Sequence, residues 1–156
     1  MSNIEKIIND AWENKEKINN NSDKSIIDAI NQTIQNLDLG KVRVAEKING
    51  NWVTHQYIKK AIMLSFRIYG MESLSGPYSS WHDKAHLLKG KTSGWTKEDF
   101  EKAGFRMVPN SPVSKGSYIG KNVVLMPCFI NTGAYIDYKI KSLPSFLQEI
   151  NVLKAV

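Results

Sequence analysis

The chain has 156 residues, a formal net charge of +6 and a single cysteine, Cys128. This length suits one compact domain or two small ones. A single cysteine excludes an intrachain disulfide, and proteins of reducing compartments usually lack disulfides. The polar start of the chain excludes a signal peptide, and no stretch reaches the roughly 20 apolar residues of a membrane span. We therefore expect a cytoplasmic protein without a membrane partner.

The basic residues are dispersed along the chain, without a run of about five or six like charges. Proteins that bind nucleic acids usually gather their lysines and arginines on one face or along one helix. We therefore expect solvated lysines and no nucleic-acid partner, and a basic nucleic-acid binder is the weakest of the alternatives.

Apolar residues at helical spacing predict a first helix over Ile4–Ile18, which ends before the amide-rich run Asn19–Asn21. A second helix is expected to begin at Ser25, because Ser25 and Asp28 have the spacing of a capping box. Gly40 is expected to end this helix, since glycine accepts positive φ.

The dipeptide Asn49-Gly50 predicts a hairpin between two short strands, because a type I′ turn needs positive φ at both central positions. Thr54 is then expected to cap a third helix. The buried face of this helix is predicted to consist of Ile58, Ala61, Ile62, Ser65 and Ile68.

The segment from Tyr69 to Gly94 contains several glycines and is expected to be mostly loop. Thr96 and Asp99 again have the spacing of a capping box, which predicts a short helix that Gly104 ends.

From Val113 onward, apolar residues recur every six positions. One series is Val113, Ile119 and Leu125, and a second series, offset by four, is Ser117, Val123, Phe129 and Tyr135. This period is typical of a hexapeptide β-helix, in which both series point inward and stack on the next coil. The alternative is an ordinary strand-rich region with chance spacing.

Two segments resemble a known family, the tetrahydrodipicolinate N-succinyltransferases. The N-terminal region of the family is similar to RVAEKINGNWVTHQYIKKAIMLSFRI (Arg43–Ile68). The start of its left-handed β-helix is similar to GFRMVPNSPVSKGSYIGKNVVLMPCFINTGAYID (Gly104–Asp137). With the opening helices included more loosely, the resemblance covers about Met1–Asp137.

The resemblance implies an α+β fold. A mainly helical domain with a β-hairpin, residues 1–103, would cover the substrate, and residues 104–137 would form the first coil of a left-handed parallel β-helix of hexapeptide repeats. It also implies succinyl transfer from succinyl-CoA, a co-substrate, to the amine of tetrahydrodipicolinate in bacterial diaminopimelate and lysine biosynthesis. Family members are homotrimers with active sites between neighbouring β-helices, and no bound cofactor or metal is implied.

Arg106 matches the family arginine, in the segment GFR, that contacts the dicarboxylate substrate. A planar guanidinium can donate two parallel hydrogen bonds to one carboxylate, which suits this role. The alternative is an arginine that closes the turn after Gly104 or pairs with a nearby acid.

After Asp137 the chain departs from the glycine-rich hexads of the family. The tail, residues 138–156, suggests an amphipathic helix through Ile140, Leu143, Leu147 and Ile150. The acids proposed for catalysis in the family lie beyond the departure, so no catalytic residue is assigned, and Asp137 does not take that role. We expect a truncated chain that is inactive alone, and the alternative is a non-catalytic remnant that acts as an oligomerisation or interaction module.

Three further residue types call for an interpretation. His82 and His86 have a zinc-ligand spacing but lack an obvious third ligand, so no metal site is expected. Cys128 lacks an evident base and is interpreted as a small hydrophobe rather than a nucleophile. The tryptophans are expected in the core or at interfaces; they are Trp12, Trp52, Trp81 and Trp95.

Overall fold

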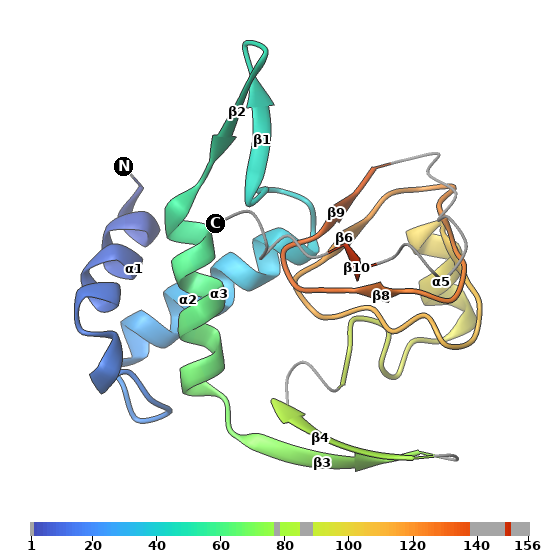
Figure 1. Cartoon of the computed structure of the whole chain (residues 1–156), viewed down its shortest axis with the longest axis horizontal. Helices are drawn as coiled ribbons and strands as arrows, with labels where there is room; N and C mark the ends of the chain where they lie inside the picture. The colour runs from blue at the N-terminus through green and yellow to red at the C-terminus, as the bar shows by residue number, and fades with distance from the viewer. Residues whose placement is uncertain (1, 77–78, 85–88, 138–148, 151–156) are drawn as a thin grey trace.

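The computed structural model describes residues 2–76, 79–84, 89–137 and 149–150. It has helices at the N-terminal side, a three-sided coil of short strands at the other side, and two projecting hairpins (Figure 1). The chain is therefore α+β, and the predicted helical character of its N-terminal part is confirmed.

Three helices build the first core: α1 (Asn3–Glu13), α2 (Lys24–Asp38) and α3 (Gln56–Ile68). The predicted buried face of α3 is confirmed, since all five of its residues are buried. The first helix is shorter than expected, because Lys15–Lys17 form a 3₁₀ turn after it. Ile18 beyond this turn is still buried against the helices.

Two predicted helix caps are wrong. Helix α2 begins at Lys24, because the amides of Ile26 and Ile27 donate to the carbonyl of Asp23, which is the cap. Helix α3 is capped by His55, since Thr54 belongs to a strand. In both places a residue of a suitable type stands near the helix start, but the backbone hydrogen bonds place the cap at another residue.

The Asn49-Gly50 hairpin is confirmed. Strands β1 (Ala45–Ile48) and β2 (Asn51–Thr54) pair in antiparallel register, and φ is +50° at Asn49 and +85° at Gly50. The hairpin projects from the helices (Figure 1), and Trp52 on it is 74% exposed. This tryptophan is therefore not a core residue of the chain.

The prediction of a loop over Tyr69–Gly94 is wrong in part, because a second antiparallel hairpin forms there. Its strands are β3 (Met71–Ser75) and β4 (Ser80–Lys84), with Leu74 opposite Trp81. Most of its side chains are exposed, so the hairpin lacks the alternating apolar pattern by which a half-buried strand is predicted.

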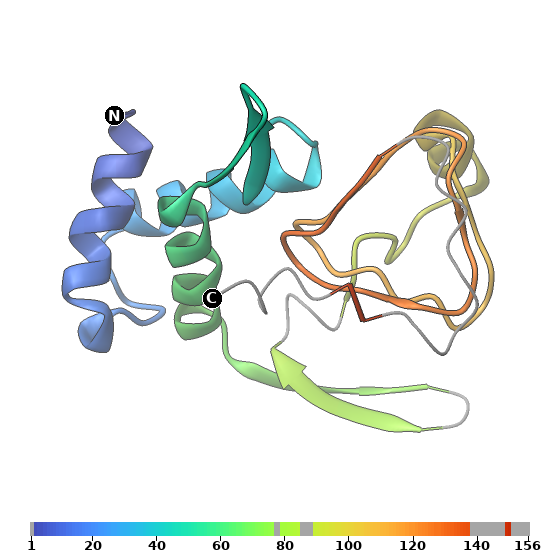
Figure 2. The same ribbon diagram turned by 45° about the horizontal axis from the view of Figure 1, so that its top comes forward.

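The short helix α5 (Lys97–Ala103) leads into the coil. Its strands are β5 (Arg106–Met107), β6 (Tyr118–Ile119), β7 (Val124–Leu125), β8 (Phe129–Ile130) and β9 (Tyr135–Ile136). β5 pairs in parallel with β7, β6 pairs in parallel with β9, and Val113 forms a parallel bridge to Ile130. Seen along its axis, the coil is triangular (Figure 2).

Of the two predicted inward-pointing series, the first is confirmed, and the second is confirmed at Ser117 and Val123 but wrong at Phe129 and Tyr135. Val113, Ile119 and Leu125 are buried, but the next buried position is Ile130, one residue short of a full hexad. The shortened hexad moves Phe129 outward, where it is 44% exposed, and leaves Tyr135 half-buried. A period alone cannot predict such a shortened turn.

The tail contributes one described element, strand β10 (Glu149–Ile150), which pairs in parallel with β8. The predicted amphipathic helix is therefore wrong at Ile150. Its other residues, and the rest of 138–156, lie outside the described residues.

The capping box of α5 is confirmed and gives a pH-dependent prediction. The Thr96 amide and hydroxyl both donate to Asp99 Oδ2, at 2.8 and 3.1 Å, and these bonds hold the pKa of Asp99 below its ordinary value. This contribution to stability is present above the ordinary pKa and is lost as the pH falls through the folded-state pKa. Thr96→Ala is expected to raise the pKa of Asp99 without restoring its ordinary value, as NMR titration would show. An unchanged pKa would contradict the hydroxyl bond.

Candidate functional site

The backbone around Arg106 is held on both sides by the coil. Helix α5 ends at Gly104, whose φ of +75° turns the chain into β5. The Asn122 amide donates to the Gly104 carbonyl at 2.7 Å, and the Arg106 amide donates to the Val123 carbonyl at 2.9 Å. Main-chain bonds thus close the turn, and the guanidinium is not needed for it.

Arg106 lines an open cavity of about 490 Å³ at the start of the coil. Its walls are Phe100, Glu101, Gly104, Phe105, Arg106, Asn122, Val123 and Val124. Phe105 is buried and packs with the rings of Phe100 and Trp95, which support this side of the cavity.

The Arg106 side chain is exposed, and among the described residues no acidic side chain forms an ion pair with it. The nearest acid in the lining, Glu101, pairs with Lys97 at 3.4 Å. The geometry therefore leaves the guanidinium available for a carboxylate, whereas the alternative of a partner acid finds no support in the described part of the chain.

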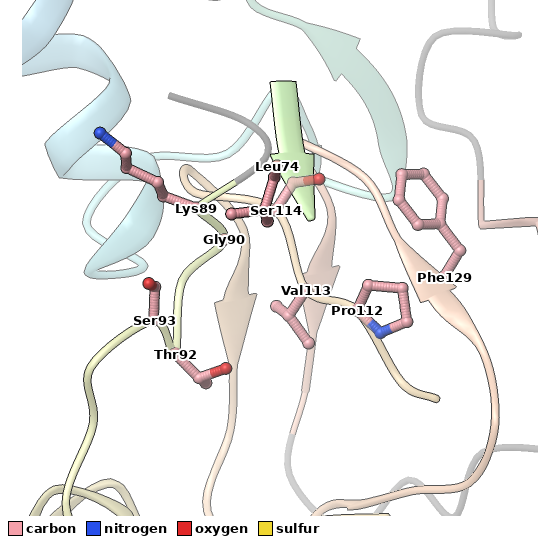
Figure 3. A pocket seen from close by; sticks show the side chains of 9 residues that line it. All are labelled: Leu74, Lys89, Gly90, Thr92, Ser93, Pro112, Val113, Ser114 and Phe129. Atoms are coloured by element: carbon pink, nitrogen blue, oxygen red, sulfur yellow. The ribbon is translucent and has the colours of Figure 1, made fainter. Parts of the chain in front are cut away.

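Two other cavities lie beside hairpin β3–β4. The smaller, about 310 Å³, is drawn in Figure 3; Lys89 points away from Pro112 and Phe129 there, and its amine is 3.6 Å from a Glu72 oxygen. The larger, about 1170 Å³, contains no lysine or arginine among its described lining residues. Neither offers a carboxylate the planar donor that Arg106 offers.

The residues weighed as metal ligands or nucleophile do not form a site in the described chain. His82 lies on exposed β4 with its Nδ1 2.9 Å from Ser73 Oγ, and His86 lies outside the described residues. No group of three or more potential metal ligands occurs in the part of the chain that the structure describes. Burial raises the pKa of the Cys128 thiol, which disfavours the thiolate that a nucleophile needs.

Sequence reasoning missed a stack of side chains between the helices and the coil. The guanidinium of Arg43 lies 3.5 Å from the ring centre of Tyr135, and Tyr135 lies 4.5 Å from Tyr118, its partner one turn earlier. The six-residue pattern includes Tyr135 but not Tyr118, and nothing in it indicates Arg43, which comes from the segment before β1.

Comparison with protein families identifies the class to which these elements are related. Residues 3–68 match the model of the tetrahydrodipicolinate N-succinyltransferase N-terminal region. The family predicted from the sequence is confirmed by this match: the chain is related to the tetrahydrodipicolinate N-succinyltransferases.

Individual relatives carry the name 2,3,4,5-tetrahydropyridine-2,6-dicarboxylate N-succinyltransferase. The protein from Pelagibacter ubique is 71% identical over 137 residues, which are 88% of this chain and 50% of the relative. Those from Dechloromonas aromatica and Sodalis glossinidius are each 46% identical, over 86% and 88% of this chain and 48% and 49% of their own. The chain thus spans about half the length of the relatives it matches. None of its described helices is long and apolar enough to cross a membrane.

Proposed function

We propose that this chain carries the acceptor-binding part of a tetrahydrodipicolinate N-succinyltransferase. The coil of short strands would be the start of a left-handed parallel β-helix, residues 104–137, and the helical residues 1–103 would cover the substrate. The observation that carries the proposal is Arg106, exposed in a cavity and without an acidic partner among the described residues. As in the relatives' name, the acceptor is a dicarboxylate, and Arg106 would hold one carboxylate by two parallel bonds.

In the proposed reaction the acceptor amine attacks the thioester carbonyl of succinyl-CoA. A C–N bond forms, the C–S bond breaks, the thiol of coenzyme A leaves, and the amine loses a proton to a base. The cavity of Arg106 presents no free base in its described lining, since Glu101 pairs with Lys97. We therefore propose that this chain alone binds the acceptor and does not complete the transfer, and that the full reaction takes place in a cytoplasmic homotrimer.

Binding of pyridine-2,6-dicarboxylate, an aromatic analogue of the acceptor, tests the role of Arg106 by calorimetry on the 156-residue chain. Arg106→Ala is expected to weaken binding about 10- to 100-fold, because it removes a charge-assisted pair of hydrogen bonds. Arg106→Lys should recover only part of the affinity, since lysine lacks the planar fork. Arg67→Ala, which removes an exposed arginine paired with Glu16, is the matched control and should bind normally.

Two outcomes would contradict the proposal. If the unaltered chain fails to bind the analogue, the acceptor site does not lie in this chain. If Arg106→Ala and Arg67→Ala bind equally well, Arg106 is not its ligand. Release of thiol from succinyl-CoA that requires the acceptor would show that the chain is active alone and would overturn the second half of the proposal.

A further inference from the structure

On one side of the coil, three segments of the chain pair in parallel, with β8 in the middle. Val113 forms a parallel bridge to Ile130 of β8, and β10 pairs in parallel with the same strand, with Ile150 opposite Ile130 and Glu149 opposite Phe129. β10 lies alongside β8 in Figure 1. The tail thus returns to the coil although it lacks the six-residue pattern.

The backbone of β8 shows which groups face β10. The Ile130 amide donates to the Pro112 carbonyl at 3.0 Å, and the Ser114 amide donates to the Ile130 carbonyl at 2.9 Å. Both groups of Ile130 therefore serve the neighbour on the Val113 side. Because successive residues of a strand direct their N–H and C=O groups to opposite neighbours, the Phe129 carbonyl and the Asn131 amide face β10, whereas the Asn131 carbonyl accepts from the Ala134 amide at 3.1 Å.

We propose that the outer edge of β8 is a strand-accepting surface and that β10 is its occupant, a cap that keeps a strand of a second copy of this chain from pairing there. An exposed edge of backbone donors and acceptors is a template for association with another chain. A strand tethered to the same chain occupies such an edge at an effective concentration near the millimolar range, well above that of a second copy in dilute solution.

Backbone pairing also explains why β10 can cover the edge of β8 although its sequence lacks the six-residue pattern. A strand pairs through its N–H and C=O groups, which every residue except proline supplies, so the cap needs no particular side chains. The inference rests on strand pairing alone and does not depend on the proposed succinyl transfer.

Hydrogen exchange on the whole chain tests the cap, because proline at Ile150 removes a ladder donor. At a concentration where the protein is monomeric, Ile150→Pro is expected to speed exchange of the Asn131 amide by about tenfold or more. The Ile130 amide, bonded to Pro112, should exchange as before and is the internal control. Lys154→Pro, a proline placed after β10, is the matched control and should change neither amide.

Sedimentation velocity completes the test. Ile150→Pro should form larger species as its concentration rises, whereas the unaltered chain and Lys154→Pro should not. Unchanged exchange at Asn131 would show that β10 does not cover the edge. Faster exchange at both Asn131 and Ile130 would show that β10 stabilises the whole coil rather than covering one edge. Faster exchange at Asn131 alone, without larger species in sedimentation, would show that a second copy does not pair at the exposed edge. Each of these results would overturn the proposal.

Discussion

Replacing Gly133 with alanine is expected to lower the free energy of unfolding by about 2 to 5 kcal/mol. Gly133 lies in the turn before β9 with φ at +88°, a conformation that costs other residues about 1 to 2 kcal/mol. A Cβ atom there would also lie 3.1 Å from Ile62 Cδ1 and 3.1 Å from Val44 Cγ2. Both neighbours are almost completely buried, so neither has room to move aside.

Gly50→Ala is the matched control for this substitution. Its φ of +85° is nearly the same, but nothing lies within 4 Å of the added Cβ, so only the backbone cost of about 1 to 2 kcal/mol applies. Urea unfolding followed by circular dichroism measures both variants, provided that the slope with urea stays constant. Equal losses at the two glycines would show that the helices and the coil do not meet closely at Gly133.

Gly133 also shows where sequence reasoning ends. The Asn49-Gly50 turn was predictable because the demand for positive φ comes from the turn itself. At Gly133 the turn also has positive φ, but a second demand comes from Ile62 and Val44, which leave little space for a Cβ and are far away in the sequence. A close approach between distant segments leaves no local pattern, so only the folded structure reveals it.

The helix caps show that the residue spacing of a capping box can also occur where no cap forms. Thr96 and Asp99 form the expected capping box, whereas Ser25 and Asp28 have the same spacing but lie within α2. The difference is that Asp23, two residues before Ser25, caps α2 through its carbonyl, which accepts from the amides of Ile26 and Ile27. A spacing rule identifies residues able to cap and does not decide between competing caps.

The candidate site was predicted from resemblance and not from periodicity. The hexads predicted short strands between Val113 and Ile136, and the structure has β6 to β9 there, but the period contains no information on what Arg106 contacts. The stack of Arg43 on Tyr135 was not predictable at all, because it joins two segments whose approach depends on how the helices meet the coil.

Replacing Asp38 is expected to have the other large effect, since this residue joins three segments. Its Oδ2 accepts from Lys91 Nζ at 2.7 Å, its Oδ1 accepts from the Gly116 amide at 2.9 Å, and its carbonyl accepts from the same lysine at 2.9 Å. The Lys91 side chain is only 9% exposed, so loss of the carboxylate would leave a largely buried ammonium group poorly compensated.

Asp38→Ala is expected to cost about 2 to 4 kcal/mol of unfolding free energy. This lies below the roughly 3 to 5 kcal/mol of fully buried pairs, because the Asp38 side chain is 25% exposed and water weakens the interaction. Asp38→Asn should cost less, since the amide oxygen can still accept from Gly116 while the charge on Lys91 loses its partner. Lys97→Ala, which removes an exposed pair with Glu101, should cost no more than about 0.5 kcal/mol and is the control.

A double-mutant cycle with Lys91→Met separates the ion pair from the bond to Gly116. If the pair carries most of the energy, Asp38→Ala should cost clearly less in the Lys91→Met background than in the unaltered chain. If the amide bond carries it, the two costs should be equal, and Asp38→Asn should resemble the unaltered protein. The second result would mean that α2 is fixed to the coil by the turn at Gly116, and that Lys91 serves only to neutralise a carboxylate already held in place.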